Sequence, residues 1–557
     1  MRCRPRWVAT LAFGVLAATV ASPALAADPI DDPRYIPVQD GGRVKPFDTY
    51  ARSLLRDLSG KEAWNGHDAT SVAMSIGADG DAWKQEPFLK VEYIALKEKY
   101  GLDRRQKYFS FEELLSRNDL LTDAETLRRS GREDFDDFEK AILDTYNKMV
   151  TLDLATKGNT PSAVPFVAMS SSPAAAGPVA DQPWFPLGTL ANAPFFADHE
   201  TRWSEVEAAT LSGDESRMRS AVVSWIDLVD DAEGYASVDP RKIDMEVAYN
   251  SINPFQRAWM FYIVSFVLFL AAWIVKNRAI GLAANFVLWG GFIFHTGALL
   301  ARQYLAGRPP ISNLYEALTF IVWGIVMLSI LFEMRYRRRI HGTVAAVLGS
   351  IGLVLAEIMP IDRELNPLVA VLRSYWMQYH VTTILLSYSA LTLAAGIAHF
   401  HLAVEWFAPH KKDLARKASD LLYTSMKIGI TFLAAGIILG AWWASESWGR
   451  YWGWDPKETW SLITLLGYIA ILHGRIAGWL TRYGMSVANV ACWGLVLFTF
   501  YGVNFFLVGL HSYAGEAAAV KLPPLLIVYL VFELIVVGVG IWYTKSGKLQ
   551  MRRTAAS

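Results

Sequence analysis

The stretch WGRYWGWDPKETW, from Trp448 to Trp460, combines four tryptophans and a tyrosine with charged side chains, and it lies between two long apolar runs. This composition suits neither the lipid interior nor bulk water, because indole and phenol rings have an apolar face and a polar edge. We therefore expect this tryptophan segment to lie along a membrane surface. Flat rings with interspersed cations also suit a flat, anionic, aromatic ligand such as a porphyrin, whose propionates Arg450 or Lys457 would hold.

Nine apolar runs follow one another after about residue 250, and each is long enough to cross about 30 Å of hydrocarbon as a helix. They lie near residues 257–275, 280–301, 312–334, 342–360, 380–405, 424–444, 461–480, 486–508 and 523–543. The sequence therefore predicts an all-α polytopic membrane protein. Its transmembrane module covers residues 257–545, and a cytoplasmic tail covers residues 546–557.

The first 27 residues have the pattern of a secretory signal peptide. A basic start precedes an apolar core, and Ala24, Leu25 and Ala26 form a plausible cleavage site. An uncleaved N-terminal anchor is the alternative. In either case, residues 28–250 are expected to be exported.

The exported part, residues 28–250, is rich in charge and carries helical patterning. The expected helices cover residues 47–58, 88–100, 111–117, 134–154 and 205–228. Residues 161–186, rich in proline, alanine and serine, are expected to form an extended loop or linker. The sequence thus predicts a mainly helical domain, with the single histidines His67 and His199 at its surface.

Composition excludes several classes of protein. The formal net charge is zero, which gives no sign of nucleic-acid binding. Cys3 and Cys492 are the two cysteines, so the sequence holds no disulfide framework, zinc knuckle or Cys-x-x-Cys-His attachment site. Any haem bound here is therefore not kept covalently.

Positive charges in alternate loops of the membrane module predict its orientation, because such loops stay on the cytoplasmic side. They are Lys276 and Arg278, Arg335 to Arg339, Lys411 to Lys417, Arg475 and Arg482, and residues 545–553. Arg302 and Arg308 are exceptions in a short outer loop. We therefore predict a multi-pass protein of the bacterial inner membrane, with residues 28–250 and the tryptophan segment on the periplasmic side.

This topology brings two histidines to the same outer face as the tryptophan segment. His380 starts the fifth apolar run, and His511 follows the eighth. Two neutral imidazoles on opposite faces of an iron porphyrin would make a six-coordinate haem, with the tryptophan segment against the ring. A role in hydrogen bonding at the membrane interface is the alternative for each histidine.

His473 is expected inside the bilayer, because it follows Trp460 by thirteen residues, or about 20 Å along a helix. A titratable group in hydrocarbon is costly and is therefore a functional candidate. The alternative is a neutral histidine bonded to a neighbouring helix.

The tryptophan segment resembles the WWD signature of haem-handling cytochrome c biogenesis proteins. The matching residues are Trp448, Gly449, Arg450, Trp452, Trp454, Asp455, Pro456, Glu458 and Trp460, and the continuation WDPKETWSL is similar to the CcsA/ResC type. The resemblance implies the C-terminal module of a System II cytochrome c synthetase. It also implies that His380 and His511 are the two external haem ligands and that His473 holds haem b within the membrane.

In this family a ResB/CcsB-like half supplies a second histidine to the inner site, and we find no counterpart of that half in the sequence. The resemblance therefore implies a ResB/CcsB-like membrane subunit as partner. His295, His399 and His401 are conceivable substitutes. Residues 41–52 and 244–255 are similar to the periplasmic segment that precedes the CcsA-type module in fused synthetases, which suggests that the exported domain binds the partner or the apocytochrome.

The activity that the resemblance implies is haem delivery across the membrane and covalent attachment of haem to apocytochrome c. No residue is expected to be a dedicated acid, base or nucleophile. The alternatives are a haem exporter or chaperone without lyase activity, a CcmF-type haem lyase subunit, and a polytopic permease with an interfacial aromatic belt, which would bind no haem.

Two further passages carry open alternatives. In GRPPISNLYEALTF, residues 307–320, Asn313 and Glu316 are polar residues at a helix start. Capping by Ser312 and Asn313 explains this passage, and docking of haem or a partner is the alternative. Gly436 and Gly440 form a small-xxx-small pair, which indicates close helix packing.

Overall fold

The computed structural model describes residues 31–132, 135–165, 184–188, 197–230, 238–336, 339–359, 361–368, 372–507, 509–510 and 524–546. The predicted signal peptide, His511 and nearly all of the predicted tail lie outside these ranges. The chain divides into two units, a first unit, Met1–Ile252, and a second unit, Asn253–Ser557.

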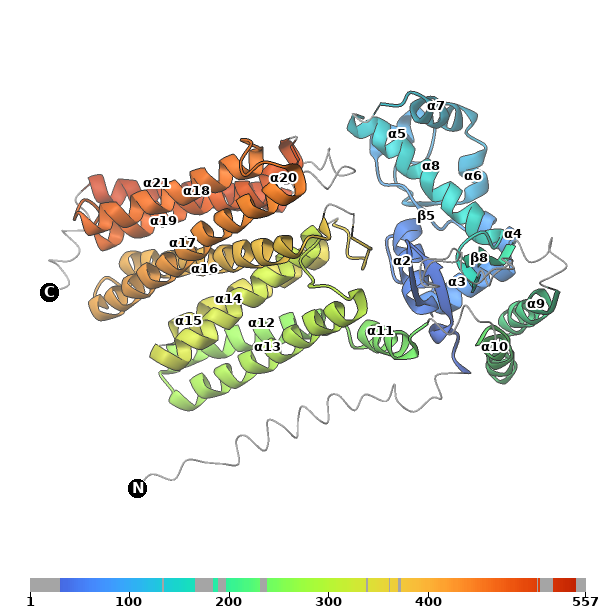
Figure 1. The fold of residues 1–557 in the computed structure, drawn as a ribbon, viewed down its shortest axis with the longest axis horizontal. Helices are drawn as coiled ribbons and strands as arrows, with labels where there is room; N and C mark the ends of the chain where they lie inside the picture. The colour runs from blue at the N-terminus through green and yellow to red at the C-terminus, as the bar shows by residue number, and fades with distance from the viewer. Residues whose placement is uncertain are drawn as a thin grey trace, which may run out of the picture. The chain divides into compact units, whose positions relative to one another are not determined.

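Helices build most of the first unit (Figure 1), around a core that includes the fully buried Leu55, Ile76 and Trp225. They are α2 (Phe47–Ser59), α3 (Ala69–Ala78), α4 (Gly80–Gln85), α5 (Ile94–Lys99), α6 (Phe111–Leu115), α7 (Asn118–Arg129), α8 (Asp137–Thr156), α9 (Ala197–Ser212), α10 (Glu215–Asp230) and α11 (Pro240–Ile252). His67 is exposed, as predicted. His199 is instead half-buried edge-on against Trp225, and this burial lowers its pKa.

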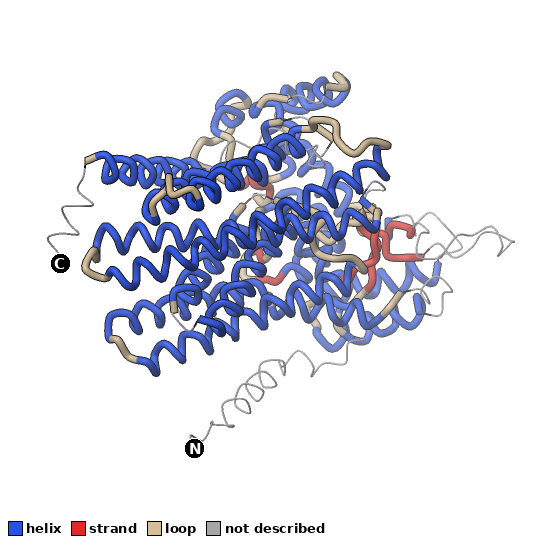
Figure 2. The backbone as a smooth tube through the Cα atoms, turned by 60° about the vertical axis from the view of Figure 1, so that its left-hand side comes forward, coloured by secondary structure: helices blue, strands red, loops and turns tan. Residues whose placement is uncertain are grey.

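Three small antiparallel sheets accompany these helices, and every strand of the described residues precedes residue 187 (Figure 2). One sheet has the order β2-β1-β7-β8, the second pairs β3 with β4, and the third pairs β5 with β6. Their bounds are β1 (Pro37–Asp40), β2 (Arg43–Pro46), β3 (Ala63–Trp64), β4 (His67–Asp68), β5 (Leu89–Lys90), β6 (Tyr108–Phe109), β7 (Ser162–Pro165) and β8 (Trp184–Pro186).

Three expectations for this unit were wrong in part. Residues 88–100 form β5 and then α5, because Leu89 pairs with Phe109 in β6 rather than continuing a helix. The single helix expected over residues 205–228 is two helices, because Gly213 adopts a left-handed backbone and Asp214 caps α10. The described ends of the expected linker, residues 161–186, pair as β7 and β8.

Long apolar helices make up the second unit, and the described residues contain nine that are long and apolar enough to cross a membrane. They are built from α12 (Pro254–Val275), α13 (Arg278–Ala306), α14 (Leu314–Tyr336), α15 (Ile340–Ile358), α16 (Tyr375–Phe407), α17 (Lys412–Trp448), α18 (Pro456–Ile476), α19 (Arg482–Leu497) with α20 (Val503–Phe506), and α21 (Pro524–Lys545). A π-helical turn, Phe498–Gly502, joins α19 to α20. The prediction of an all-α polytopic membrane protein is confirmed.

Helices α16 and α17 lie side by side along most of their length (Figure 1). Glycines make this approach possible, since a Cβ on Gly429 would come 2.5 Å from the Leu391 side chain and one on Gly436 would come 2.6 Å from Ile384. The close packing predicted from Gly436 and Gly440 is therefore present. This pair of helices positions the candidate site.

Candidate functional site

The tryptophan segment forms the turn between α17 and α18. Gly449 ends α17 in a left-handed conformation, with φ of 72°. Asp455 then caps α18: its carboxylate accepts from the Lys457 N–H at 3.0 Å, and Glu458 Oε2 accepts from the Asp455 N–H at 3.2 Å. Two acidic residues of the motif thus have a structural role, because they fix the direction in which α18 leaves the loop.

Aromatic side chains are presented outward by this loop. The Trp454 side chain is 70% exposed and that of Tyr451 59%. Trp452 lies edge-on to Trp454, with ring centroids 5.8 Å apart. Trp454 also has a positive φ of 59°, a strained backbone for a bulky residue. A strained residue whose large ring remains exposed contributes little to folding, which is typical of a surface that binds a ligand.

Arg450 lies directly over Gly453, where an added Cβ would come 1.3 Å from the guanidinium Nη1. The Arg450 Nη1 lies 3.7 Å from Glu458 Oε1, too far for a hydrogen bond. Lys457, by contrast, is hydrogen-bonded through its Nζ to the Asn504 side chain. Of the two cations proposed from sequence, Arg450 is therefore the better placed to receive an anionic group.

His380 lies in the second turn of α16 and is fixed against α17. Its Nδ1 donates to the Gly436 carbonyl at 2.8 Å, and its ring stacks on Trp443 at 5.9 Å with an interplanar angle of 18°. A Cβ on Gly440 would come 2.5 Å from the imidazole Cε1, so only glycine leaves room for the ring. Since a carbonyl only accepts, Nδ1 carries the proton, and the lone pair of the neutral imidazole is on Nε2.

A series of ring contacts connects His380 with the tryptophan segment. Trp443 contacts both His380 and Trp448, and the ring centroids of Trp443 and Trp448 are 4.8 Å apart. The ends of the two helices are also tied together, because the Ser374 hydroxyl donates to Glu446 at 2.8 Å. The structure therefore brings together His380 and the first tryptophan of the motif.

The residue before His511 is bonded to the same motif. The Leu510 N–H donates to Asp455 Oδ1 at 2.6 Å, and a Cβ on Gly509 would lie 2.5 Å from that oxygen. Trp460 further packs on Phe498, with ring centroids 4.2 Å apart. His511 itself lies outside the described residues. The expected convergence of His380 and His511 on one iron therefore stays a prediction.

His473 lies on α18, and its side chain is exposed on the outside of this unit. Its Nδ1 donates to the Ile469 carbonyl of the same helix at 2.9 Å, which places the lone pair on Nε2. In the described part of the chain it therefore bonds within α18 and not to a neighbouring helix. An exposed imidazole on a membrane-spanning helix faces lipid or a second protein.

The three substitute histidines are engaged elsewhere. His295 is buried between the Tyr262 hydroxyl at 3.1 Å and the Thr319 carbonyl at 3.0 Å. His399 lies between the Ala395 carbonyl and Glu533, and His401 between Ser486 and Glu405. Each has both ring nitrogens in these contacts, so iron binding there would require breaking them.

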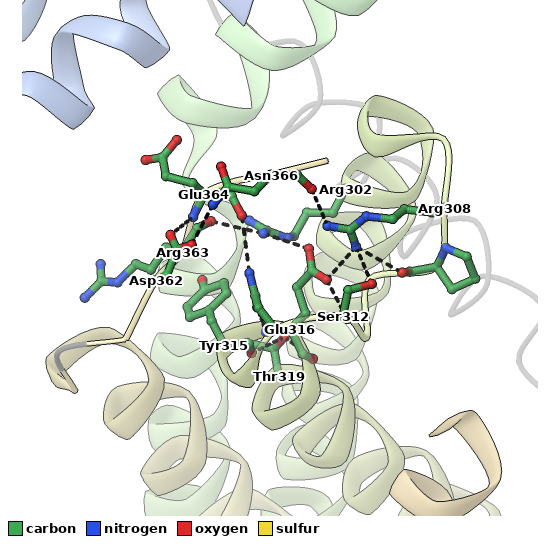
Figure 3. A network of polar contacts seen from close by, with 12 residues as sticks. Arg302, Arg308, Ser312, Tyr315, Glu316, Thr319, Asp362, Arg363, Glu364 and Asn366 are labelled. Atoms are coloured by element: carbon green, nitrogen blue, oxygen red, sulfur yellow. Dashed lines mark hydrogen bonds and ion pairs between the residues drawn. The ribbon is translucent and has the colours of Figure 1, made fainter. Parts of the chain in front are cut away.

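A buried ion triad explains the two arginines that departed from the charge pattern (Figure 3). Glu316 is fully buried, and its carboxylate forms ion pairs with Arg302 Nη2 at 3.1 Å and with Arg308 Nη1 at 2.7 Å. Arg302 lies within α13, not in the expected loop, and both guanidiniums also donate to carbonyls of residues 363 and 366. Asn313 caps α14 through the Glu316 N–H, as one alternative predicted. Paired, buried charges of this kind should not be counted in a charge-based topology.

Comparison with known proteins places this geometry in a family. A family model described as "Cytochrome C assembly protein" matches residues 311–511, which include His380 and the whole tryptophan segment. Cytochrome c biogenesis protein CcsA of Prochlorococcus marinus is 36% identical over 245 residues, which cover 39% of this chain and 78% of that protein. The chain belongs to the cytochrome c assembly family and is a multi-pass membrane protein with a role in cytochrome c biogenesis.

A second relative also matches part of the first unit. Protein NrfI of Wolinella succinogenes is 29% identical over 498 residues, which cover 85% of this chain and 53% of NrfI. The chain thus spans about half the length of that relative. The solved structure of the cytochrome c haem lyase CcmF aligns with a TM-score of 0.38 and 19% identity, over 54% of this chain and 52% of that one, and adds nothing to the assignment.

Proposed function

We propose that this protein is the CcsA-type subunit of a cytochrome c synthetase, which carries haem b across the bacterial inner membrane and attaches it to apocytochrome c on the periplasmic side. The observation that carries the proposal is the position of His380, which is held by the Gly436 carbonyl and stacks on Trp443, the ring that contacts Trp448 of the tryptophan segment. An imidazole that is fixed near the end of α17 where the tryptophan segment begins suits one face of an iron porphyrin.

The second axial ligand in this proposal is His511. The hydrogen bond from the Leu510 N–H to Asp455 supports it, because it ties the preceding residue to the end of the tryptophan segment. Trp454 and Trp452 would contact the ring, and Arg450 would hold a propionate through the guanidinium edge that makes no hydrogen bond with Glu458.

The exposed position of His473 supports an inner site that is shared with another subunit. One imidazole on the outside of a helical bundle supplies one axial ligand, so a six-coordinate iron needs a second ligand from another chain. We assign that second ligand to a ResB/CcsB-like membrane subunit. Haem would enter at this shared site near His473 and then pass to the outer face.

The attachment reaction needs no acid or base from this chain. Each thiol of the apocytochrome Cys-x-x-Cys-His segment adds across one haem vinyl group to form a thioether, and the histidine of that segment replaces one of the axial ligands. The side chains described above orient the substrate and exclude water, and vinyl and thiol supply the reactivity.

Co-expression tests this function. The chain and a ResB/CcsB-like subunit are produced with an apocytochrome in a host that lacks its own maturation system, and covalent haem is stained after denaturing electrophoresis. Attached haem supports the synthetase. Haem that co-purifies with the chain without attachment would instead support an exporter or chaperone, and no haem at all would support a permease.

A further inference from the structure

The first unit contains a cavity of about 610 Å³ that has no part in the proposed haem chemistry. It lies between the β3–β4 hairpin, α3, α4 and the turn that joins α9 to α10, all within this one unit. Its volume falls in the range of roughly 300–1,000 Å³ that is usual for ligand sites.

Two tryptophans and two methionines form much of the lining: Trp64, Trp83, Met74 and Met218. The indoles are held in place, since Trp64 donates to Glu86 at 3.1 Å and Trp83 donates to the Ser75 hydroxyl at 3.0 Å. Methionine side chains are flexible and polarizable, and they adapt to apolar groups of different shape. Fixed rings beside adaptable thioethers suit a ligand whose apolar groups vary from one molecule to the next.

A buried hydroxyl in this lining has no hydrogen-bond partner. Thr70 is 3% exposed, and in the described part of the chain its Oγ1 makes no hydrogen bond. An unpaired buried hydroxyl destabilises the protein, and because Thr70 lines the cavity, a turn of its side chain toward the cavity would let a ligand supply the missing donor or acceptor. A peptide backbone supplies both.

The charges of the lining favour a cation. Glu86 receives two neutral donors, Trp64 Nε1 and Asn65 Nδ2, and it forms no ion pair with any described residue. No lysine or arginine lines the cavity in the described ranges, and its other titratable residues are His67, Asp214 and Glu215. Asp214 caps α10 and Glu215 pairs with Arg219, so Glu86 is the carboxylate that a ligand cation would meet.

We propose that this cavity binds an extended segment of an unfolded polypeptide in which apolar side chains flank a lysine or arginine. The apolar side chains contact the tryptophans and methionines, and the cation pairs with Glu86. The peptide backbone bonds to Thr70 Oγ1 once this buried side chain turns toward the cavity. Identification of the polypeptide with the apocytochrome rests on the proposed function, since an apocytochrome is unfolded before haem is attached. Peptide binding itself needs no haem.

Fluorescence anisotropy with the full chain in lipid nanodiscs tests this proposal. The probes are a short labelled peptide in which leucines flank one lysine, and the same peptide with glutamate in place of lysine. We expect saturable binding of the lysine peptide and binding weaker by roughly ten-fold for the glutamate peptide, the size of one charge-assisted contact. Glu86→Gln should remove this preference, and Ala82→Trp, at an exposed position of the lining, should block both peptides.

Matched variants on the same unit provide the controls. Glu112→Gln removes an exposed carboxylate and Leu115→Trp adds an exposed indole, both on α6 and outside the lining, and neither should change binding. The proposal is overturned if the chain shows no saturable peptide binding, or if the Glu86 and Ala82 variants bind the peptides as the control variants do. It is also overturned if a simple alkylamine binds as tightly as the peptide. Peptide binding without haem attachment would contradict only the proposed function, and attachment without peptide binding would contradict only the cavity.

Discussion

Replacing Gly440 by alanine tests the outer haem site through one added methyl group. The new Cβ would lie 2.5 Å from His380 Cε1 and 2.7 Å from Nδ1. Nonbonded carbons approach to about 3.5 Å, so the rigid imidazole must withdraw by about 1 Å. Because the Nδ1 contact with the Gly436 carbonyl is now 2.8 Å, a withdrawal of this size takes it beyond hydrogen-bonding range and also moves Nε2, the nitrogen that would bind iron.

The expected loss follows from the cost of overpacking. Inserting a methyl group into a well-packed site costs about 1–3 kcal/mol, which corresponds to haem binding weaker by roughly 5- to 150-fold if the cost falls on the bound state. Haem content per purified protein and a haemin titration measure this change. The absorption spectrum of the reduced protein should also lose bis-histidine bands in favour of a five-coordinate or mixed species.

Gly494→Ala is the matched control, since Gly494 lies in another membrane helix and its added Cβ would meet nothing within 4 Å. This variant should retain wild-type haem content and spectrum. If Gly440→Ala behaves in the same way while its thermal stability is unchanged, the imidazole is not held as the structure describes or does not bind iron, and the reasoning is refuted.

Four further outcomes follow. His380→Gly and, separately, His511→Gly should lower haem content, with partial recovery in added imidazole; unchanged spectra in both would remove them from the site. His473→Ala should leave the melting temperature near wild type, because the side chain is exposed. It should nevertheless reduce attached haem in the co-expression assay, and full attachment would exclude the inner-site role. Asp455→Ala removes the cap of α18 and the bond from Leu510, so cap loss alone should lower stability by about 1 kcal/mol, and unaltered haem content would show that the Leu510 contact is dispensable. Glu316→Ala leaves Arg302 and Arg308 buried without their anion and should destabilise the protein by about 3–5 kcal/mol; a wild-type melting temperature would contradict the buried triad.

Local features of the chain were read correctly from sequence because they depend on neighbouring residues alone. The nine spans follow from runs of apolar residues that match the thickness of a bilayer, and the structure contains nine such helices in its described part. The cap at Asn313 follows in the same way from a polar residue at a helix start.

Errors arose where residues distant in sequence decide the conformation. Leu89 joins a strand because Phe109 pairs with it, and helical periodicity over residues 88–100 contains no trace of that partner. Arg302 and Arg308 resemble ordinary loop charges in the sequence, because nothing in the local pattern shows that Glu316 is buried between them as their counterion. The spacing of Gly436 and Gly440 did predict close packing, but it did not reveal that the packed side chain is His380.

The sequence by itself determined the class of this protein, since apolar run length and the tryptophan motif are properties of consecutive residues. Only the tertiary structure decided which nitrogen of His380 has the lone pair, because that depends on a carbonyl fifty-six residues away. The outward position of His473 and the unpaired Thr70 hydroxyl depend in the same way on packing between separate elements. Local chemistry encodes each helix, and the contacts between elements determine which atoms a ligand meets.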